Sequence, residues 1–432
     1  MMSYPASVEF LYGLQRRGIK LGLDTIEAML ARLGRPHDRY PALHIAGTNG
    51  KGSTAAMAAS VLQAAGYRTG LYTSPHLVDF RERIRVNHEP IPEDGVSDVT
   101  EHVREALGSA LHPTFFEFAT ALALQYFADA EVDVAVIEVG MGGRFDATTA
   151  VTPLVSAITN VALDHEEYLG RTVEAVAFEK AGIIKRGVPV VAGRLTADAA
   201  GVIGRIAAER RAPLFRLGSE FRVEADPPEG FRYEGLRDTY EGLSCQLRGA
   251  HQLDNAACAL AMLELAATRG LPYSEDSIRR GLATVSWEGR LEVAEQHPLL
   301  VLDGAHNPAA AEALAAYLVS HRRSHPDSRI IAVVGMMRDK NRAGFLRIIL
   351  PLVDEMILTR AQTDRAATVE ELRASLGARG ETAYLAPLPA DALARARRLA
   401  SSADLICVTG SLMLVGEVKA LLRGCALSPL RG

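Results

Sequence analysis

The sequence of 432 residues has few cysteines, no long apolar run and no excess of charge of one sign. Its four cysteines, Cys245, Cys258, Cys407 and Cys425, lie far apart and form neither a metal-binding spacing nor a disulfide pattern. No stretch approaches the roughly 20 apolar residues that a membrane-spanning helix needs. Residues 1–16 lack the apolar centre of a signal peptide. We therefore expect a cytoplasmic protein with free thiols.

The charges are nearly balanced, with 47 Lys and Arg against 52 Asp and Glu and a net charge of −5. This balance argues against the basic surface that binds nucleic acid or an anionic membrane. A hydrophobic content of 48% and a charged content of 23% are typical of globular proteins. We expect a monomer that acts on small molecules, without a nucleic-acid or membrane partner. The length favours two domains over one core.

Short apolar runs alternate with longer helical patterns along the chain, which predicts an α/β protein with mostly parallel sheets. Near-continuous apolar runs predict buried strands at Val132–Val139, Leu154–Asn160 and Val188–Ala192. Residues Glu220–Leu247 alternate instead and predict an antiparallel excursion. A second strand–helix series begins around Ser286–Arg290. We predict a larger domain over residues 1–287 and a smaller α/β domain over residues 288–432.

The strongest local signal is a glycine-rich stretch between a short apolar run and an alanine-rich helical pattern. It comprises Gly47, Thr48, Asn49, Gly50, Lys51, Gly52, Ser53 and Thr54. In a strand–loop–helix context, such a stretch brings backbone N–H groups and a helix N-terminus to phosphate. Lys51 adds a positive charge and a hydroxyl group can reach Mg²⁺. Although Gly52 departs from the usual P-loop spacing, this context favours a nucleotide site over a simple turn before a helix.

Three residues downstream of the loop could carry chemistry. Glu138 ends an apolar strand, where ligands of parallel sheets bind, and a Mg²⁺ shared with Ser53 would offset the cost of burying the carboxylate. The alternative is a strand-end acid bonded to backbone N–H groups. His165 follows the next strand, a position where a lone histidine is usually a surface residue. Lys180 lies near a predicted helix C-terminus, and the residues alone favour a cation that complements the helix dipole.

The second half of the chain holds a similar arrangement after the strand that ends at Leu302. Asn307 and Pro308 are explained as the cap and first residue of a helix, which leaves Asp303 and His306 unexplained. Four arginines could hold an acidic substrate through bidentate contacts or form a solvated face: Arg81, Arg83, Arg85 and Arg144. Phe115 and Phe116 open a helical pattern and predict either core or the wall of a pocket for a flat ring.

Six motifs in one order resemble the folylpolyglutamate synthase/dihydrofolate synthase group of the Mur ligase superfamily. They are Gly47–Ser53, Thr73–Leu77, Leu163–His165, Glu179–Ile184, Asp303–Pro308 and Gly410–Leu412. The resemblance covers the chain from about residue 8 almost to its end. Gly52 and the Thr73–Leu77 segment favour the folate branch over the cell-wall ligases. The resemblance implies an N-terminal P-loop ATPase domain and a C-terminal Rossmann-like domain that closes over the nucleotide.

The resemblance also implies a reaction. ATP phosphorylates a substrate carboxylate, the α-amine of L-glutamate attacks the acyl phosphate, and an amide, ADP and phosphate result. The implied substrates are ATP, L-glutamate and dihydropteroate or folate, and the implied cofactor is Mg²⁺, with two ions. A Mur-type ligase for a non-folate carboxylate and a nucleotide-dependent switch protein without ligase activity are the alternatives.

The resemblance assigns roles to individual residues. Ser53 and Glu138 would hold the first Mg²⁺, and Glu138 and His165 would hold the second. Lys180 matches a lysine of the family that becomes carbamylated. This role replaces the interpretation of Lys180 as a cation that complements the helix dipole. With Lys51, the residues Glu138, His165 and Lys180 form the predicted catalytic set. Nucleotide contacts beyond the loop would come from Gln252, Asn255, Arg290, Asp303 and His306. The substrate side would comprise Thr73, Ser74, Pro75, His76, Arg81, Arg83, Arg85, Phe115, Phe116, Arg144 and Asp146. Thr149 and His88 depart from the family pattern, which usually has Asn and Gly at these positions.

Overall fold

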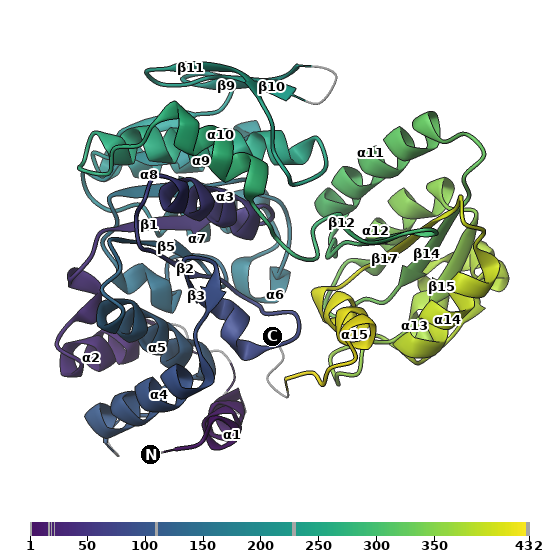
Figure 1. The fold of residues 1–432 in the computed structure, drawn as a ribbon, viewed down its shortest axis with the longest axis horizontal. Coiled ribbons are helices and arrows are strands. Elements are labelled where there is room, and N and C mark those ends of the chain that lie inside the picture. Colours follow the sequence, from purple (N-terminus) through teal and green to yellow (C-terminus); the bar gives the residue numbers. More distant parts are fainter. Residues whose placement is uncertain are drawn as a thin grey trace. The chain divides into compact units, whose positions relative to one another are not determined.

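The computed structural model describes residues 2–15, 18, 20, 22–108, 111–226 and 230–428. The chain forms two compact units (Figure 1). Unit 1 contains the described residues of Met1–Gln246 and Leu253–Ser286, and unit 2 contains Leu247–Gln252 and Trp287–Ser428. Within the described residues, none of the helices is both long and apolar enough to cross a membrane.

Unit 1 is built on a sheet with the strand order β4-β3-β2-β5-β1-β6-β7-β8. In spatial order, the strands β2, β5, β1, β6, β7 and β8 pair in parallel. At the β2 edge, β3 pairs antiparallel with β2, and β4 pairs antiparallel with β3. The strands are β1 (Ala42–Ala46), β2 (Thr69–Tyr72), β3 (Ile84–Val86), β4 (Glu89–Pro90), β5 (Val134–Glu138), β6 (Val155–Ile158), β7 (Val190–Ala192) and β8 (Leu214–Arg216). The predicted mostly parallel α/β fold is therefore confirmed.

Helices cover both faces of this sheet, so the central strands β1, β5 and β6 are buried along their whole length (Figure 1). Burial on both faces explains why these strands read as continuous apolar runs. The α-helices are α1 (Tyr4–Gln15), α2 (Asp24–Arg32), α3 (Lys51–Ala64), α4 (Glu93–Leu107), α5 (Phe115–Asp129), α6 (Glu166–Leu169), α7 (Val173–Ala181), α8 (Ala197–Glu209), α9 (His251–Ala267) and α10 (Glu275–Thr284). Short 3₁₀ helices are η1 (Pro36–Asp38), η2 (Phe80–Arg83) and η3 (Ala147–Ala150).

The predicted antiparallel excursion is confirmed as a separate sheet in the order β11-β10-β9 (Figure 1). Its strands are β9 (Arg222–Asp226), β10 (Gly230–Glu234) and β11 (Thr239–Leu243), and residues 227–229 of the predicted excursion lie outside the described residues. Glu264 of α9 holds this sheet, because its buried carboxylate accepts the Tyr233 hydroxyl at 2.9 Å and the N–H of Leu236 at 2.8 Å.

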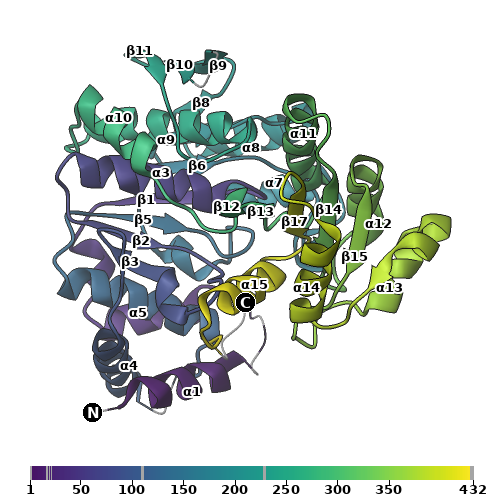
Figure 2. The ribbon, with the colours of Figure 1, turned by 45° about the vertical axis from the view of Figure 1, so that its right-hand side comes forward.

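Unit 2 contains a sheet with the strand order β12-β13-β17-β14-β15-β16, parallel except for the β12–β13 pair. The strands are β12 (Glu292–Gln296), β13 (Leu299–Leu302), β14 (Ile330–Val334), β15 (Glu355–Leu358), β16 (Tyr384–Leu385) and β17 (Leu405–Thr409). The helices are α11 (Pro308–Ser324), α12 (Arg342–Ile349), α13 (Val369–Ser375), α14 (Pro389–Leu399) and α15 (Leu412–Arg423), with η4 (Leu350–Leu352) and η5 (Gly377–Thr382). Helices α14 and α15 pack together, as do α11 and α12 (Figure 2), and this smaller α/β unit confirms the second half of the predicted fold.

Candidate active site

The glycine-rich stretch joins β1 to α3 at the carboxyl edge of the unit 1 sheet. Gly50 caps α3 with φ +82°, and a Cβ atom at this residue would lie 2.3 Å from Oδ1 of Asn255 on α9. Gly47 has φ +152°, and its Cβ would lie 1.9 Å from Oγ1 of Thr159. Both positions therefore require glycine. Asn255, the neighbour of Gly50, is also one of the predicted nucleotide contacts. Gln252 lies one turn earlier on α9 and is buried.

The residues that follow β6 shape this loop through hydrogen bonds that the sequence did not predict. Asn160 accepts the N–H of Thr48 on its carbonyl at 3.0 Å and the N–H of Asn49 on its Oδ1 at 2.9 Å. Thr159 donates its hydroxyl to the Asn49 carbonyl at 2.6 Å. The loop is thus held from the neighbouring strand, and the available signal was a Thr-Asn pair directly after an apolar run.

Two lysines converge on one carbonyl of the loop. The Nζ atoms of Lys51 and Lys180 each donate to the Gly47 oxygen at 3.0 Å. Lys180 is 3% exposed, and burial together with the positive charge of Lys51 lowers the pKa of Lys180 to about 7. This buried position beside a second lysine does not fit a cation whose role is to complement the dipole of the helix. Lys51 instead brings a positive charge to the glycine loop beside an amine that is partly neutral near neutral pH.

The predicted metal ligands lie around the same edge of the sheet. Glu138 is the last residue of β5, in register with Ile45 of β1, and is 5% exposed. Its Oε2 accepts the N–H of Ser74 at 3.0 Å. Ser53 is buried in the first turn of α3, and His165 precedes α6 with φ +50°.

A buried carboxylate one strand away from a phosphate-type loop fits a divalent cation, because Mg²⁺ prefers oxygen ligands. In the described part of the chain no three His, Cys, Asp or Glu side chains gather in a metal-binding arrangement. Only Glu138 and His165 of the predicted set belong to these residue types. The metal prediction therefore also depends on the Ser53 hydroxyl and on Lys180 in its carbamylated form.

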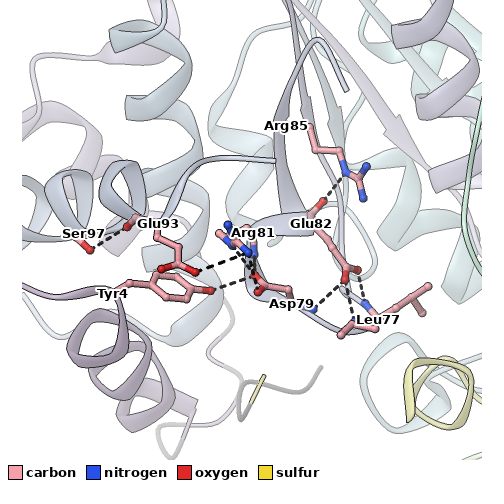
Figure 3. Close-up of polar contacts among 9 residues, drawn as sticks. Tyr4, Leu77, Asp79, Arg81, Glu82, Arg85, Glu93 and Ser97 are labelled. Atoms are coloured by element: carbon pink, nitrogen blue, oxygen red, sulfur yellow. Dashed lines mark hydrogen bonds and ion pairs between the residues drawn. The ribbon is translucent and has the colours of Figure 1, made fainter. Parts of the chain in front are cut away.

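The predicted substrate segment Thr73–His76 follows β2 and runs into a turn that Glu82 organises (Figure 3). The Glu82 carboxylate accepts the N–H groups of Leu77, Val78 and Asp79 at 2.7, 3.0 and 2.8 Å. In the same view, Asp79 binds the Arg81 side chain at 3.1 Å and the hydroxyl of Tyr4 at 3.0 Å. Sequence reasoning missed Glu82, because its role depends on three backbone groups and not on a motif.

The other predicted arginines have different surroundings. Arg83 is 2% exposed, donates from Nε to Nδ1 of His76 at 2.8 Å and lies 5.2 Å from the ring centre of Phe115. Arg85 donates from Nε to the Glu82 carbonyl at 3.1 Å. Arg144 pairs with Glu179 at 2.6 Å. Phe116 lies beside Tyr72, with ring centres 6.3 Å apart.

Asp146 is buried and accepts the N–H of Met141 at 2.9 Å and the hydroxyl of Thr148 at 2.6 Å. Burial raises the pKa of Asp146 against these hydrogen bonds. The two departures from the family pattern have structural settings. Thr149 donates to the Gly143 carbonyl at 2.6 Å, and His88 adopts φ +68° in the turn between β3 and β4, a conformation that suits glycine better.

In unit 2, the predicted nucleotide residues cluster after β13. The Asp303 carboxylate accepts the N–H groups of Leu291 at 2.9 Å and Ala305 at 3.0 Å. Arg290 lies next to the same loop, because a Cβ on Gly304 would be 2.8 Å from its Nη1. His306 is bonded through Nδ1 to the Gly304 carbonyl at 2.8 Å, and Asn307 caps α11 as predicted.

Two families match this chain in sequence. The family described as Mur ligase middle domain matches residues 45–263, and the family described as Mur ligase, glutamate ligase domain matches residues 289–412. These matches define the class of protein as the Mur ligases.

Relatives narrow the class. A dihydrofolate synthase/folylpolyglutamate synthase of Bacillus subtilis is 34% identical over 433 residues, covering 98% of this chain and 99% of the relative. Solved structures of Escherichia coli FolC with DHPP and ADP (TM-score 0.88) and of the Yersinia pestis synthase with AMPPNP and Mn (TM-score 0.89) are each 34% identical, and each match covers 98% of both chains. The chain belongs to the dihydrofolate synthase/folylpolyglutamate synthase family of Mur ligases, which confirms the resemblance of its motifs.

Proposed function

We propose that the protein is an ATP-dependent ligase that joins L-glutamate to dihydropteroate, to the glutamyl tail of folates, or to both. The observation that carries this proposal is the convergence of Lys51 and Lys180 on Gly47, with the buried carboxylate of Glu138 at the end of the adjacent strand. The names of the relatives support the substrate class, and a similar solved structure is described as a bifunctional folylpolyglutamate synthase/dihydrofolate synthase with Mn, AMPPNP and L-glutamate bound.

The residues of unit 1 suit phosphoryl transfer, which needs positioning and charge neutralisation. The loop N–H groups and Lys51 would hold the triphosphate while its terminal phosphoryl group passes to the acceptor carboxylate. The α-amine of glutamate then attacks the acyl phosphate, releasing phosphate as the amide forms. Mg²⁺, held by Ser53 and Glu138, would neutralise the phosphate charge.

The finer assignments belong to the same proposal. Glu138 and His165 would hold a second Mg²⁺, together with Lys180 as a carbamate. We propose that residues 1–287 form the ATP-binding domain and residues 288–432 the Rossmann-like ligase domain. Arg290, Asp303 and His306 would then contact the nucleotide from the second domain. The monomeric state and the cytoplasmic location stay predictions.

One assay tests the reaction and its substrate class. Purified protein with ATP, Mg²⁺ and labelled glutamate is offered dihydropteroate, tetrahydrofolate or a UDP-sugar acid as acceptor. Incorporation with either of the first two supports the proposal, and incorporation with the UDP-sugar acid alone indicates a Mur-type ligase for another carboxylate. Nucleotide binding without incorporation indicates a switch protein.

Lys51→Ala tests the nucleotide site in the same assay. We expect glutamate-dependent ADP release to fall by on the order of 100-fold or more, because Lys51 stabilises charge on the transferred phosphoryl group. Circular dichroism should show an unchanged fold. Normal turnover by the folded variant would contradict the P-loop assignment.

A further inference from the structure

Arg290, one of the proposed nucleotide contacts, lies in a short segment with an unusual backbone conformation. Its neighbours Gly289 and Leu291 have φ values of +69° and +47°. A positive φ is uncommon for a bulky residue such as leucine, and it persists only where the surrounding structure imposes it. The contacts that impose this conformation therefore also determine where the Arg290 side chain lies.

The loop that follows β13 holds one side of this segment. The Gly289 carbonyl accepts the N–H of Gly304 at 2.9 Å, and the Leu291 N–H donates to Asp303 at 2.9 Å. The Gly289 carbonyl also accepts Nη1 of Arg290 at 3.0 Å. The position of the guanidinium is therefore tied to the conformation of Gly289.

Two acidic residues flank the segment, and both pair with one lysine of α15. Lys419 is 3% exposed, its Nζ lies 3.1 Å from the Glu288 carboxylate, and it also donates to Oε1 of Glu292. The other oxygen of Glu292 accepts the N–H of Gly289 at 2.7 Å. A buried ammonium group is costly unless it is paired, and two carboxylates pair with this one. Lys419 thus joins both ends of the segment Glu288–Glu292 to one helix.

The other end of α15 contacts the loop after β13. Gly410 donates its N–H to the Ala305 carbonyl at 3.0 Å. Leu412 packs against Gly304, because a Cβ atom on this glycine would lie 2.3 Å from the leucine Cδ2. These contacts use the last of the six sequence motifs, to which the proposed reaction assigns no role. Helix α15 therefore connects the loop after β13 with the segment that carries Arg290.

We propose that Lys419 is a positioning residue for nucleotide binding. By pairing with Glu288 and Glu292, it holds the backbone on both sides of Arg290 in the conformation from which the guanidinium contacts the nucleotide. Lys419 acts through Arg290 and does not contact the ligand itself. The inference rests on the proposed function for the contact between Arg290 and ATP.

A double-mutant cycle tests this role on the full chain, with binding of AMPPNP and Mg²⁺ measured by calorimetry. Arg290→Ala should weaken binding by roughly 10- to 100-fold, the effect of losing hydrogen bonds to a charged group. Lys419→Met should cause most of the same loss when Arg290 is present. In the Arg290→Ala background it should weaken binding by less than about twofold, because the side chain that it positions is absent.

Independent losses that multiply in the double variant would show a general structural effect of Lys419 and would overturn the proposal. Wild-type affinity in a folded Lys419→Met or in Arg290→Ala would also overturn it. Arg397→Met is the matched control, because Arg397 of α14 pairs with Glu295, near the end of β12 that lies farther along the chain from Arg290. This control should bind the analogue as tightly as wild type, and a loss as large as that of Lys419→Met would contradict the specific role of Lys419.

Two further variants test the ion pairs even if Lys419→Met does not fold. Glu292→Gln removes one charge from the contact and leaves Lys419 paired with Glu288. It should weaken binding several-fold, and the loss should disappear in the Arg290→Ala background. Lys419→Arg keeps a cation between the carboxylates and should bind the analogue nearly as tightly as wild type. Unchanged binding by Glu292→Gln, or a large loss in a folded Lys419→Arg, would overturn the proposal.

Binding is measured without acceptor or glutamate, so the two proposals can fail separately. Coupling between Lys419 and Arg290 in a protein that does not incorporate glutamate would refute the ligase function alone. Glutamate incorporation together with independent effects of the two substitutions would refute this inference alone.

Discussion

Lys180 shows how one buried residue changes the interpretation of the site. Its position near the end of α7 fits a cation that complements the helix dipole, and the residues alone favour that role. The fold instead buries the amine against the Gly47 carbonyl, next to Lys51. Burial and the neighbouring cation lower the pKa of Lys180 to about 7, so a large fraction of the amine is neutral near neutral pH. A neutral amine is the form that can add CO₂.

Lys180→Ala therefore tests the carbamate at the residue scale. We expect turnover to fall by on the order of 100-fold, the effect of removing a preorganised charged group. A small carboxylic acid such as acetate should restore part of the activity, because it can replace the missing carbamate oxygens. Lys185→Ala is the matched control, since Lys185 instead donates to the Thr149 carbonyl, and its activity should not respond to acetate. Full activity of Lys180→Ala without acetate would show that the assignment is wrong.

At the scale of elements, the sequence predicts best where periodicity is long or burial is complete. The predicted runs Val132–Val139, Leu154–Asn160 and Val188–Ala192 contain the strands β5, β6 and β7. The N-terminal helices α1 and α2 and the three-residue strand β8 were not anticipated, because short or weakly patterned segments depend on tertiary contacts for their structure. Site residues that lie directly after strands were predictable, whereas side chains that act through backbone groups, such as Asn160 and Glu82, were not.

A buried network of hydrogen-bonded side chains that links β1 to η3 was also not predictable from the sequence. The Thr148 hydroxyl donates to Asp146, so its oxygen accepts the Nε2–H of His44 at 2.8 Å. Nδ1 of His44 is buried without a hydrogen-bond partner in the described structure. Burial, with a smaller contribution from Lys185, lowers the pKa of His44 to about 3. His44 therefore stays neutral in the folded protein at pH values where the unfolded chain is protonated.

This difference predicts a pH-dependent stability of unit 1. Below the unfolded-state pKa of about 6.5, His44 is protonated in the unfolded chain but not in the folded protein. The free energy of unfolding therefore decreases as the pH is lowered. The slope from His44 should approach about 1.4 kcal/mol per pH unit between pH 6 and 4. Hydrogen exchange of the β1 amides measures it, and His44→Gln should show a shallower slope. Equal slopes in the two proteins would contradict the prediction.

At the scale of the whole molecule, the predicted nucleotide residues belong to both units. The glycine loop and Asn255 lie in unit 1, whereas Arg290 and Asp303 lie in unit 2. The chain enters the main part of unit 2 at Trp287, and the next residues are anchored within that unit. Glu288 pairs with Lys419 at 3.1 Å and with Arg423 at 2.6 Å. The connection between Ser286 and Glu288 is therefore one stretch that a rearrangement of the units would have to bend, besides the crossings at Gln246–Leu247 and Gln252–Leu253.

Trp287 is the only tryptophan in the chain, so chymotrypsin can report on this connection. If ATP is bound by residues of both units, then a non-hydrolysable ATP analogue with Mg²⁺ should slow cleavage after Trp287 several-fold, because closure around a ligand restricts the hinge. Mass spectrometry of the fragments ending at Trp287 and starting at Glu288 measures the rate.

Chelation of Mg²⁺ should abolish the protection. Lys51→Ala should be cleaved at the unprotected rate with or without the analogue, since it cannot hold the phosphates. An unchanged cleavage rate in wild type with the bound analogue would show that the nucleotide does not join the two units, and the nucleotide contacts proposed for Arg290, Asp303 and His306 would then be wrong.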